Sequence, residues 1–544
     1  MSTTKVSNYL IGGSDRGRHP ATMGSQVSVN LFTEKSGGNV YMASVPGLQK
    51  WKNVASPGAR CRGMYVASSG LTEYGGNPDM FVVFDTGVYR IQRNSTVTQI
   101  GTVNAGTDMV SFAETGGLRN MLLVADGVQL YCYDLLEGGS MQPVTLPERI
   151  TADGGKIRPS SVSVVGGSIA VNDINTGFVY YSVPYPLNSE KREVFEMEQD
   201  AEGKWQPKYD PDNPLKVLTK EVDSVDYVFY DDYGVTQYFN AESSADSIVA
   251  LKSVGERLYL FGTRSIEIWQ RGSGEYETWI RTSYTTNASN GLAEQNSIAV
   301  VDSTIFYIGS GDSYAKGVMC VTGNNYTKVS DDWLEAKLLK EFSGRAIGFA
   351  YAVGSHRFYC ITLPTVDETW VYDTDTKEWH QRVSRVLNTG LERSWRPMAL
   401  VWFDDRFYAA CNDGTVYLHT EEYYWEDFAG EGRLPVLRRR QGAVIVDEER
   451  PFVFDELSIE CNVGSWENYE VEPKMLLEIS KDGGNTWGNV RSVSMGKAGE
   501  YSRRVRFHHL GLNRLCVIRV TFAYPAALEL TACSQRVTAT GAMI

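Results

Sequence analysis

A two-strand unit recurs along this 544-residue chain and restricts the folds that the chain can adopt. Each copy has a strand of aromatic and branched residues, a short turn with glycine or aspartate, and a second strand ending in tyrosine or tryptophan. The copies start at Met80, Asn120, Gly167, Glu256, Ser303, His356 and Asp405. Most steps between them are about 40 to 53 residues, and the step from Gly167 to Glu256 is about twice as long.

A repeat of this length with several strands per unit predicts a β-propeller. The sheet of one blade has two apolar faces, and only radial packing against its neighbours covers both. Seven units of about 45 residues need roughly 315 residues, which residues 60–420 supply once an insertion of about 50 residues is set aside. The 52 glycines and 12% aromatic residues suit such a fold. We therefore predict an all-β protein whose propeller has about seven blades, with six possible.

A second pattern begins near Val436. Apolar and polar residues alternate strictly there, which is the period of a strand with one buried face. One face carries Leu457, Ile459, Cys461 and Val463, and the other carries Glu456, Ser458, Glu460 and Asn462. This alternation predicts a C-terminal β-sandwich over residues 436–544.

These patterns divide the chain into three parts. Residues 1–59 are predicted to form an N-terminal arm and a strand that closes the propeller, 60–435 the propeller, and 436–544 the sandwich. An acidic stretch over 189–234 is predicted to project from the propeller rim between the third and fourth units. It is either a solvated surface excursion or an interaction arm.

Charge and targeting signals narrow the function. The chain has 66 acidic and 52 basic residues, which gives a net charge of −14. The first 435 residues have a net charge of −15, so the predicted sandwich is close to neutral. This balance excludes a tight general binder of duplex DNA. No apolar window is long enough to span a membrane, and no signal peptide opens the chain, so we expect synthesis in the host cytoplasm without membrane insertion.

The sharpest local motif is an Asp box, S-x-D-x-G-x-T-W, known from sialidases. Its residues are Ser480, Asp482, Gly484, Thr486 and Trp487. We interpret it as a structural hairpin in which Asp482 accepts backbone N–H bonds, Gly484 supplies a positive φ and Trp487 packs beneath. The motif occurs once and outside the propeller, whereas a sialidase repeats it around its propeller. A sialidase-like or other glycan-hydrolysing or glycan-binding propeller is the alternative.

Other catalytic and ligand signatures are missing from the sequence. The acidic run at 209–214 lacks the spacing of a calcium loop, and the six histidines lack zinc-ligand spacing. Neither a nucleophile elbow nor a phosphate-binding glycine loop occurs. We therefore predict no catalytic residue, no metal and no cofactor, and hence a protein that is not an enzyme.

Two basic clusters remain as a candidate interaction surface. They are Arg438, Arg439 and Arg440, and then Arg503, Arg504 and Arg506 followed by His508. On a strand, Arg504, Arg506 and His508 share one face. That face is either simply solvated, or it contacts an acidic partner or nucleic-acid phosphates.

Several segments resemble the tail hub, or packaged-DNA stabilisation, proteins of short-tailed bacteriophages, also called tail accessory or nozzle proteins. The resemblance covers nearly the whole chain except the insertion. It lies in residues 28–51, 242–270, 290–309, 356–380 and 477–522.

This resemblance implies a structural role in the virion tail. Members of that family form a ring, taken as a hexamer, below the portal and its adaptor. They extend the DNA channel, retain the packaged genome, and carry the needle or plug and the tailspikes or fibres. DNA is then a passing partner rather than a tightly bound ligand, and an acidic channel wall would keep it from sticking.

Overall fold

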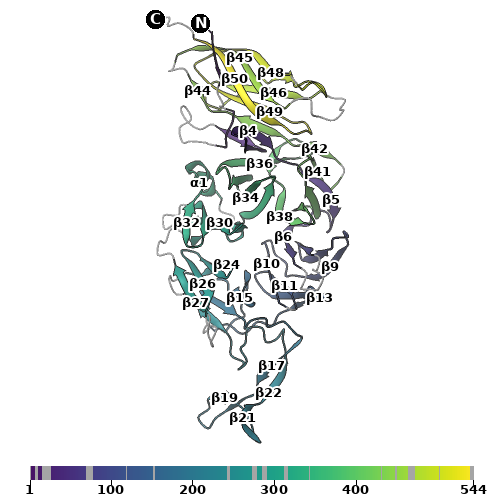
Figure 1. Ribbon diagram of the computed structural model, residues 1–544, viewed down its shortest axis with the longest axis vertical. Helices are drawn as coiled ribbons and strands as arrows, with labels where there is room; N and C mark the ends of the chain where they lie inside the picture. The colour runs from purple at the N-terminus through teal and green to yellow at the C-terminus, as the bar shows by residue number, and fades with distance from the viewer. Residues whose placement is uncertain are drawn as a thin grey trace.

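The computed structural model describes residues 2–6, 10–14, 26–68, 78–117, 119–150, 154–241, 246–272, 279–284, 291–310, 316–341, 344–430, 432–446, 450–462, 472–501 and 503–539. Nearly all regular structure in these ranges is β-strand. A sandwich lies at one end of an elongated molecule, a ring of sheets in the middle, and the insertion at the opposite end (Figure 1). The predicted all-β fold, a propeller followed by a sandwich, is confirmed.

Seven sheets with radial packing make up the propeller within the described residues. Each of the seven sequence copies supplies the second and third strands of one sheet. The first sheet contains β6 (Cys61–Ala67), β7 (Asp79–Phe84), β8 (Gly87–Ile91) and β9 (Val97–Thr102), and the second contains β10 (Ser111–Glu114), β11 (Met121–Ala125), β12 (Leu130–Asp134) and β13 (Gly138–Pro143). The third sheet contains β14 (Val162–Val165), β15 (Ser168–Asn172), β16 (Phe178–Tyr181) and β23 (Tyr238–Asn240). The fourth contains β24 (Ile248–Val254), β25 (Arg257–Gly262), β26 (Ile266–Arg271) and β27 (Trp279–Tyr284).

The remaining three sheets are more elaborate. In the fifth blade, a 3-10 turn, η1 (Gln295–Ser297), lies between the first two strands, and helix α1 (Asp332–Leu338) follows the last strand. The fifth sheet contains β28 (Gly291–Leu292), β29 (Ala299–Val301), β30 (Thr304–Ser310), β31 (Lys316–Thr322) and β32 (Asn325–Lys328). The sixth contains β33 (Ile347–Val353), β34 (His356–Leu363), β35 (Glu368–Asp373), β36 (Trp379–Arg385) and β37 (Glu392–Ser394). The seventh contains β38 (Pro397–Phe403), β39 (Arg406–Cys411), β40 (Thr415–His419) and β5 (Gln49–Asn53).

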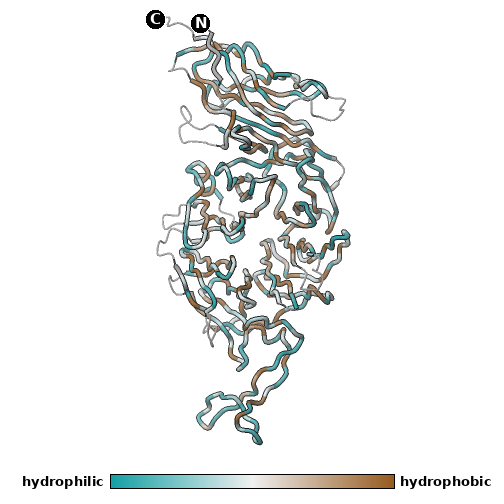
Figure 2. The backbone as a smooth tube through the Cα atoms, viewed as in Figure 1, coloured by the Kyte–Doolittle hydropathy of each residue, from teal (hydrophilic) through white to brown (hydrophobic). Residues whose placement is uncertain are grey.

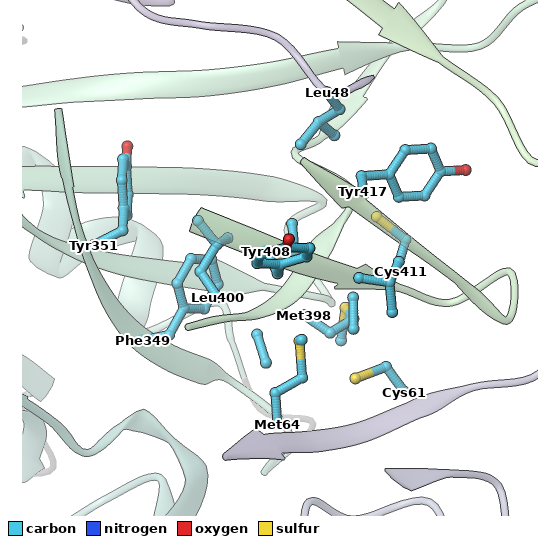
Figure 3. Close-up of a cluster of buried hydrophobic side chains, with 14 of the residues drawn as sticks. Leu48, Cys61, Met64, Phe349, Tyr351, Met398, Leu400, Tyr408, Cys411 and Tyr417 are labelled. Carbon is cyan, nitrogen blue, oxygen red and sulfur yellow. The ribbon is translucent and has the colours of Figure 1, made fainter. Parts of the chain in front are cut away.

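The ring closes through the N-terminal strand β5, which is the outer strand of the seventh sheet and pairs with β40. A buried cluster seals the same seam from inside. Cys61 and Met64 of the first blade lie in one cluster with Met398 and Cys411 of the seventh (Figure 3). Residues from all seven blades line an axial cavity of about 240 Å³.

The sandwich takes strands from both ends of the chain. Its outer sheet is β3 (Leu31–Ser36), β4 (Asn39–Ser44), β50 (Glu529–Ala539), β45 (Phe452–Cys461) and β48 (Val505–Asn513), with β1 (Ser2–Val6) paired to β50. Its other sheet is β2 (Val27–Val29), β43 (Arg438–Gln441), β49 (Leu515–Phe522), β46 (Lys474–Ser480) and β47 (Arg491–Ser494), with β44 (Ile445–Val446) paired to β49. The apolar positions of the alternating pattern, such as Leu457 and Ile459, are buried between the sheets.

One sheet joins the two parts. The sixth blade continues through β2, which bridges in parallel to β36 at Val29 and Gln381 and pairs antiparallel with β43. Asn30 reinforces this joint, because its Nδ2 donates to the carbonyls of Val383 (2.9 Å) and Leu437 (2.8 Å). A short hairpin of β41 (Trp425–Asp427) and β42 (Arg433–Pro435) lies nearby. The predicted domain boundaries stay a prediction, and part of the predicted N-terminal arm, 7–9 and 15–25, lies outside the described residues.

The insertion sits inside the third blade, because β23 returns to pair with β16. The predicted place between the third and fourth repeat units allowed an insertion either within the third blade or between two blades, and the strand pairing shows the first. The repeat spacing could not separate the two cases, since either one lengthens the same step. Its strands are β17 (Lys191–Phe195) with β22 (Thr219–Asp223), β18 (Met197–Gln199) with β19 (Trp205–Pro207), and β20 (Tyr209–Asp210) with β21 (Asn213–Val217).

Candidate assembly surfaces

A row of basic side chains follows the edge strand β48 of the sandwich. Arg504, immediately before it, is exposed together with Arg506 and His508, while Val505 and Phe507 are buried between the sheets. The structure therefore brings these three predicted residues to one face, as alternation along a strand requires.

Acidic side chains on the neighbouring strand β45 partly neutralise this row. Glu460 lies 3.4 Å from Arg504, and Glu456 lies 3.4 Å from His508. Arg506 faces Ser458 instead, and it has no ion-pair partner in the part of the chain that the structure describes. Exposed pairs of this kind contribute only about 0–1 kcal/mol each, so the row is free to exchange partners.

The first predicted residue of the second cluster, Arg503, stands apart from the row. Its Nη1 lies 3.1 Å from Glu500 and 3.8 Å from Glu472. These contacts turn the side chain toward the loops at the end of the sandwich. Arg503 therefore belongs to a local ion-pair network.

The other cluster is largely inside the molecule. Arg438 and Arg440 are fully buried, because β43 is an interior strand between β2 and β49 and both side chains face the same way. Arg438 Nη1 donates to the carbonyls of Val436 (3.1 Å) and Tyr524 (2.6 Å), and burial lowers its pKa to about 9. The expectation that both arginines lie on an interaction surface is wrong for this chain.

Arg440 and Arg439 fix neighbouring segments. Arg440 Nε donates to the Leu10 carbonyl (3.0 Å) and its Nη1 to the Gly13 carbonyl (2.9 Å), which ties the N-terminal segment to the sandwich. Burial lowers the Arg440 pKa to about 10. Arg439 binds the Glu392 carboxylate of β37 with both terminal nitrogens. The cluster therefore connects elements of one chain.

The Asp box forms the loop between β46 and β47. Thr486 donates to Asp482 from its backbone N–H (2.8 Å) and from its hydroxyl (2.5 Å), and Ser480 Oγ donates to it as well (2.6 Å). These bonds hold the Asp482 pKa well below its ordinary value. Gly484 has a φ of +98°. The guanidinium carbon of Arg519 lies 3.8 Å from the centroid of the Trp487 ring. Both oxygens of the Asp482 carboxylate accept hydrogen bonds from within the turn, so the motif has a structural role.

The insertion forms a stem that divides into two hairpins. At the branch, Lys208 N–H donates to the Glu196 carbonyl (2.7 Å), Leu218 N–H to the Lys208 carbonyl (2.8 Å), and Glu196 N–H to the Leu218 carbonyl (2.9 Å). Residues 189–234 contain 13 acidic and 6 basic side chains, which is half of the net charge of the chain. The distal hairpins are mostly hydrophilic (Figure 2), yet Trp205 is 61% and Leu215 93% exposed.

A buried ion triad at the joint between propeller and sandwich was missed by the sequence analysis. His356 donates from Nδ1 to Asp373 (2.7 Å) and from Nε2 to Glu34 (3.0 Å). The two carboxylates raise the His356 pKa to about 9 against the opposing effect of burial. Glu34 is 322 positions away in the chain, so no spacing rule could have found the triad.

The same histidine belongs to a group that a metal ion could use. Ligand atoms of His356, Asp373 and Asp375 lie within 4.8 Å of one another. Both ring nitrogens of His356 are already hydrogen-bonded to carboxylates, so the arrangement is that of an ion triad.

Two models of a known protein family match this chain. A family model described as the β-propeller of bacteriophage P22 Gp10 matches residues 229–418, and one described as its β-sandwich matches 438–538. The matches follow the order of the two structural parts and together cover more than half of the chain. The chain belongs to the bacteriophage P22 Gp10 family. It is a structural tail protein of a short-tailed phage, as the resemblance implied.

Most of the insertion, residues 189–228, lies outside both Gp10 matches. No curated protein matches the chain. Among the described residues, no helix is long and apolar enough to cross a membrane.

The structure is also similar to solved structures of low sequence identity. A streptogramin B lyase is 10% identical, with 65% of this chain and 97% of that chain covered and a TM-score of 0.35. A virginiamycin B lyase from Staphylococcus aureus is 11% identical, with 69% and 99% covered and a TM-score of 0.39. BamB from Moraxella catarrhalis is 10% identical, with 75% and 98% covered and a TM-score of 0.31. Likenesses at this level carry no argument about function.

Proposed function

We propose that this Gp10-family protein forms a ring, taken as a hexamer, below the portal and its adaptor in the phage tail. The ring extends the DNA channel, retains the packaged genome, and anchors the needle or plug and the tailspikes or fibres. The observation that carries the proposal is the pair of Gp10 matches, propeller and sandwich in one chain and in that order.

The charge distribution supports a conduit rather than a DNA-binding protein. The first 435 residues carry a net charge of −15, which repels phosphate along any wall they form. DNA then passes through without tight binding. A basic lumen in the assembled ring would contradict this part of the proposal.

The two ends of the molecule offer separate contact regions. The basic row of Arg504, Arg506 and His508 lies on the sandwich, and the acidic insertion lies at the far end (Figure 1). Surfaces of opposite charge at opposite ends suit a component that joins an upper neighbour to a lower one. We assign the insertion to contacts with a tail-tip protein.

Electron microscopy of the virion tests the proposal most directly. The expected result is density for this propeller and sandwich in a symmetric ring between the portal and the tail tip. Density in the capsid or inside a fibre would overturn the proposal, and a ring of another order would correct the hexamer alone.

A glycan-hydrolysing propeller is the function that competes with this one. The Asp box no longer favours it, because the Asp482 carboxylate is bonded within its own turn. A screen of the purified chain on sialosides and bacterial surface polysaccharides is expected to show no turnover. Turnover that is lost on replacing one carboxylate pair would reverse the conclusion.

A further inference from the structure

The axial cavity of the propeller has a single charged side chain among the described residues of its wall. Most of the lining residues are apolar or glycine, and they include Met64, Phe112 and Phe349. The exception is Lys252 of β24, which lines the cavity and is partly exposed. A positive charge therefore lies near the axis of a propeller whose overall charge is strongly negative.

The geometry of the blades does not require a lysine at this position. The inner strands β6, β24 and β38 each have a β-bulge near their start. The residues two positions beyond the bulge are Tyr65, Lys252 and Val401. Uncharged side chains thus meet the packing needs of this position in two other blades, and packing alone does not explain the ammonium group.

The ammonium group of Lys252 has no counter-charge. Within the part of the chain that the structure describes, its Nζ has neither an ion-pair nor a hydrogen-bond partner, and burial alone acts on its pKa, which is lowered. Two other partly exposed lysines are paired, because Lys316 lies 2.7 Å from Glu294 and Lys337 lies 2.6 Å from Glu368. An ammonium that is withdrawn from bulk water without a partner is costly, so an anion beside Lys252 would be stabilising.

The hydroxyl groups of the cavity wall are already used by the backbone. Ser111 Oγ accepts from the Val162 N–H (3.1 Å). Ser161 Oγ accepts from the Leu251 N–H and donates to the Leu251 carbonyl, both at 3.0 Å. The side chain of Asn296, in contrast, lines the cavity without a hydrogen bond to any described residue. One ammonium and one carboxamide are therefore available to a ligand, which suits a ligand with a single negative charge.

The cavity is large enough for a small organic molecule. Its volume of about 240 Å³ far exceeds the roughly 10–15 Å³ that one water molecule needs. We propose that the axial cavity binds a small organic monocarboxylate, whose carboxylate pairs with Lys252 and accepts a hydrogen bond from Asn296. Its apolar body packs on the methionine and phenylalanine side chains of the wall. The site lies within one chain and stands apart from the tail function proposed above.

Butyrate is the probe for this site, and butyramide is its uncharged isostere. The thermal midpoint of the full chain is followed during a titration with each compound at constant ionic strength, with sodium chloride as the balancing salt. A saturable rise is expected with butyrate, because a ligand that binds only the folded state stabilises it by mass action. Crystals grown with butyrate are expected to show its density beside Lys252. No saturable response, as for a cavity that holds only water, would overturn the proposal, and so would an equal response to butyramide.

Variants separate this site from general effects of salt and charge. Lys252→Met is expected to abolish the butyrate response and, without butyrate, to raise the thermal midpoint, since an unpaired charge is removed. Lys252→Arg keeps the charge and is expected to keep a saturable response. Lys220→Met makes the same charge change at an exposed position of β22 and is expected to keep the wild-type half-saturating concentration.

A variant of the second ligand group keeps the test decisive if Lys252→Met does not fold. Asn296→Leu removes one hydrogen bond to a charged group, so it is expected to raise the half-saturating butyrate concentration about tenfold. A wild-type titration in Lys252→Met, or in Asn296→Leu, would contradict the assignment of the carboxylate to this cavity.

Discussion

At the scale of single residues, the joint between propeller and sandwich depends on groups that lie far apart in the chain. Glu34 comes from the β3–β4 hairpin of the sandwich, whereas His356 and Asp373 come from the sixth blade. All three are at least three-quarters buried. A protonated histidine between two carboxylates is well paired there, and its loss would leave two acids without their counter-charge.

The raised pKa of His356 predicts a pH-dependent stability. Below the unfolded-state value of about 6.5 the histidine is protonated in both states, so its contribution is fully present. That contribution is lost as the pH rises through the folded-state pKa of about 9. A shift of this size corresponds to roughly 3 kcal/mol. We expect the thermal midpoint of the wild type to fall between about pH 6.5 and 9 and that of His356→Gln to change less; the exposed His508→Gln is the control. Parallel profiles for wild type and His356→Gln would contradict the triad.

At the scale of elements, β48 presents its basic row on one face of the sandwich. Because the opposite residues, Val505 and Phe507, are buried in the core, the row cannot rotate away without unfolding the strand. This geometry fixes the backbone beneath the row, so a partner can bind there without rearranging the strand.

Charge reversal tests that surface. We expect Arg504→Glu with Arg506→Glu to fold with a thermal midpoint within a few degrees of the wild type, since exposed substitutions change stability by about 0.5 kcal/mol each. Incorporation into virions is expected to fall. Lys474→Glu with Arg514→Glu makes the same charge change at exposed positions elsewhere on the sandwich and is the matched control. Unaltered infectivity of the first variant would mean that the row is merely solvated.

The insertion is separable from the propeller by its strand pairing. Phe195 and Thr219 are paired at the end of the stem, so an Asn-Gly turn can replace residues 196–218 and close a two-residue hairpin. We expect this variant to keep the propeller stability within about 1 kcal/mol, because a surface loop is exchanged for a shorter one. Virion protein composition is the second readout, in which a tail-tip protein is expected to be depleted. A full complement of tail proteins would reduce the insertion to a surface excursion.

At the scale of the whole molecule, propeller and sandwich share a sheet. The sixth blade continues through β2 into the sandwich, and Asn30 bonds to both sides of that strand, with a φ of +53° that asparagine tolerates well. Because a continuous sheet and a buried ion triad join the propeller and the sandwich, we expect the two parts not to behave as independent domains.

Calorimetry tests this coupling. We expect a single unfolding transition for propeller and sandwich, because the sheet is shared. Asn30→Ala removes the amide that bonds the carbonyls of Val383 and Leu437, and it places alanine at a positive φ, so it is expected to cost about 2–4 kcal/mol. The variant is expected to broaden or split the transition. Two transitions in the wild type would show that the parts unfold separately.

The architecture follows from the sequence, because local periodicity specifies it. Each blade repeats a hairpin whose apolar residues must pack on both faces, and the alternation from Leu457 to Cys461 allows one buried face only. The exposed row of Arg504, Arg506 and His508 follows from the same rule of alternation.

Which polar residues are buried, and which groups they contact, depends on tertiary packing. Arg438 and Arg440 share the basic composition of the exposed row, but β43 lies inside a sheet, and strand order in a sheet is a long-range property. The place of the insertion within the third blade and the His356 triad also depend on contacts between distant segments. Periodicity along a strand sets which way a side chain points, whereas burial of that side chain depends on which strands pack on either side.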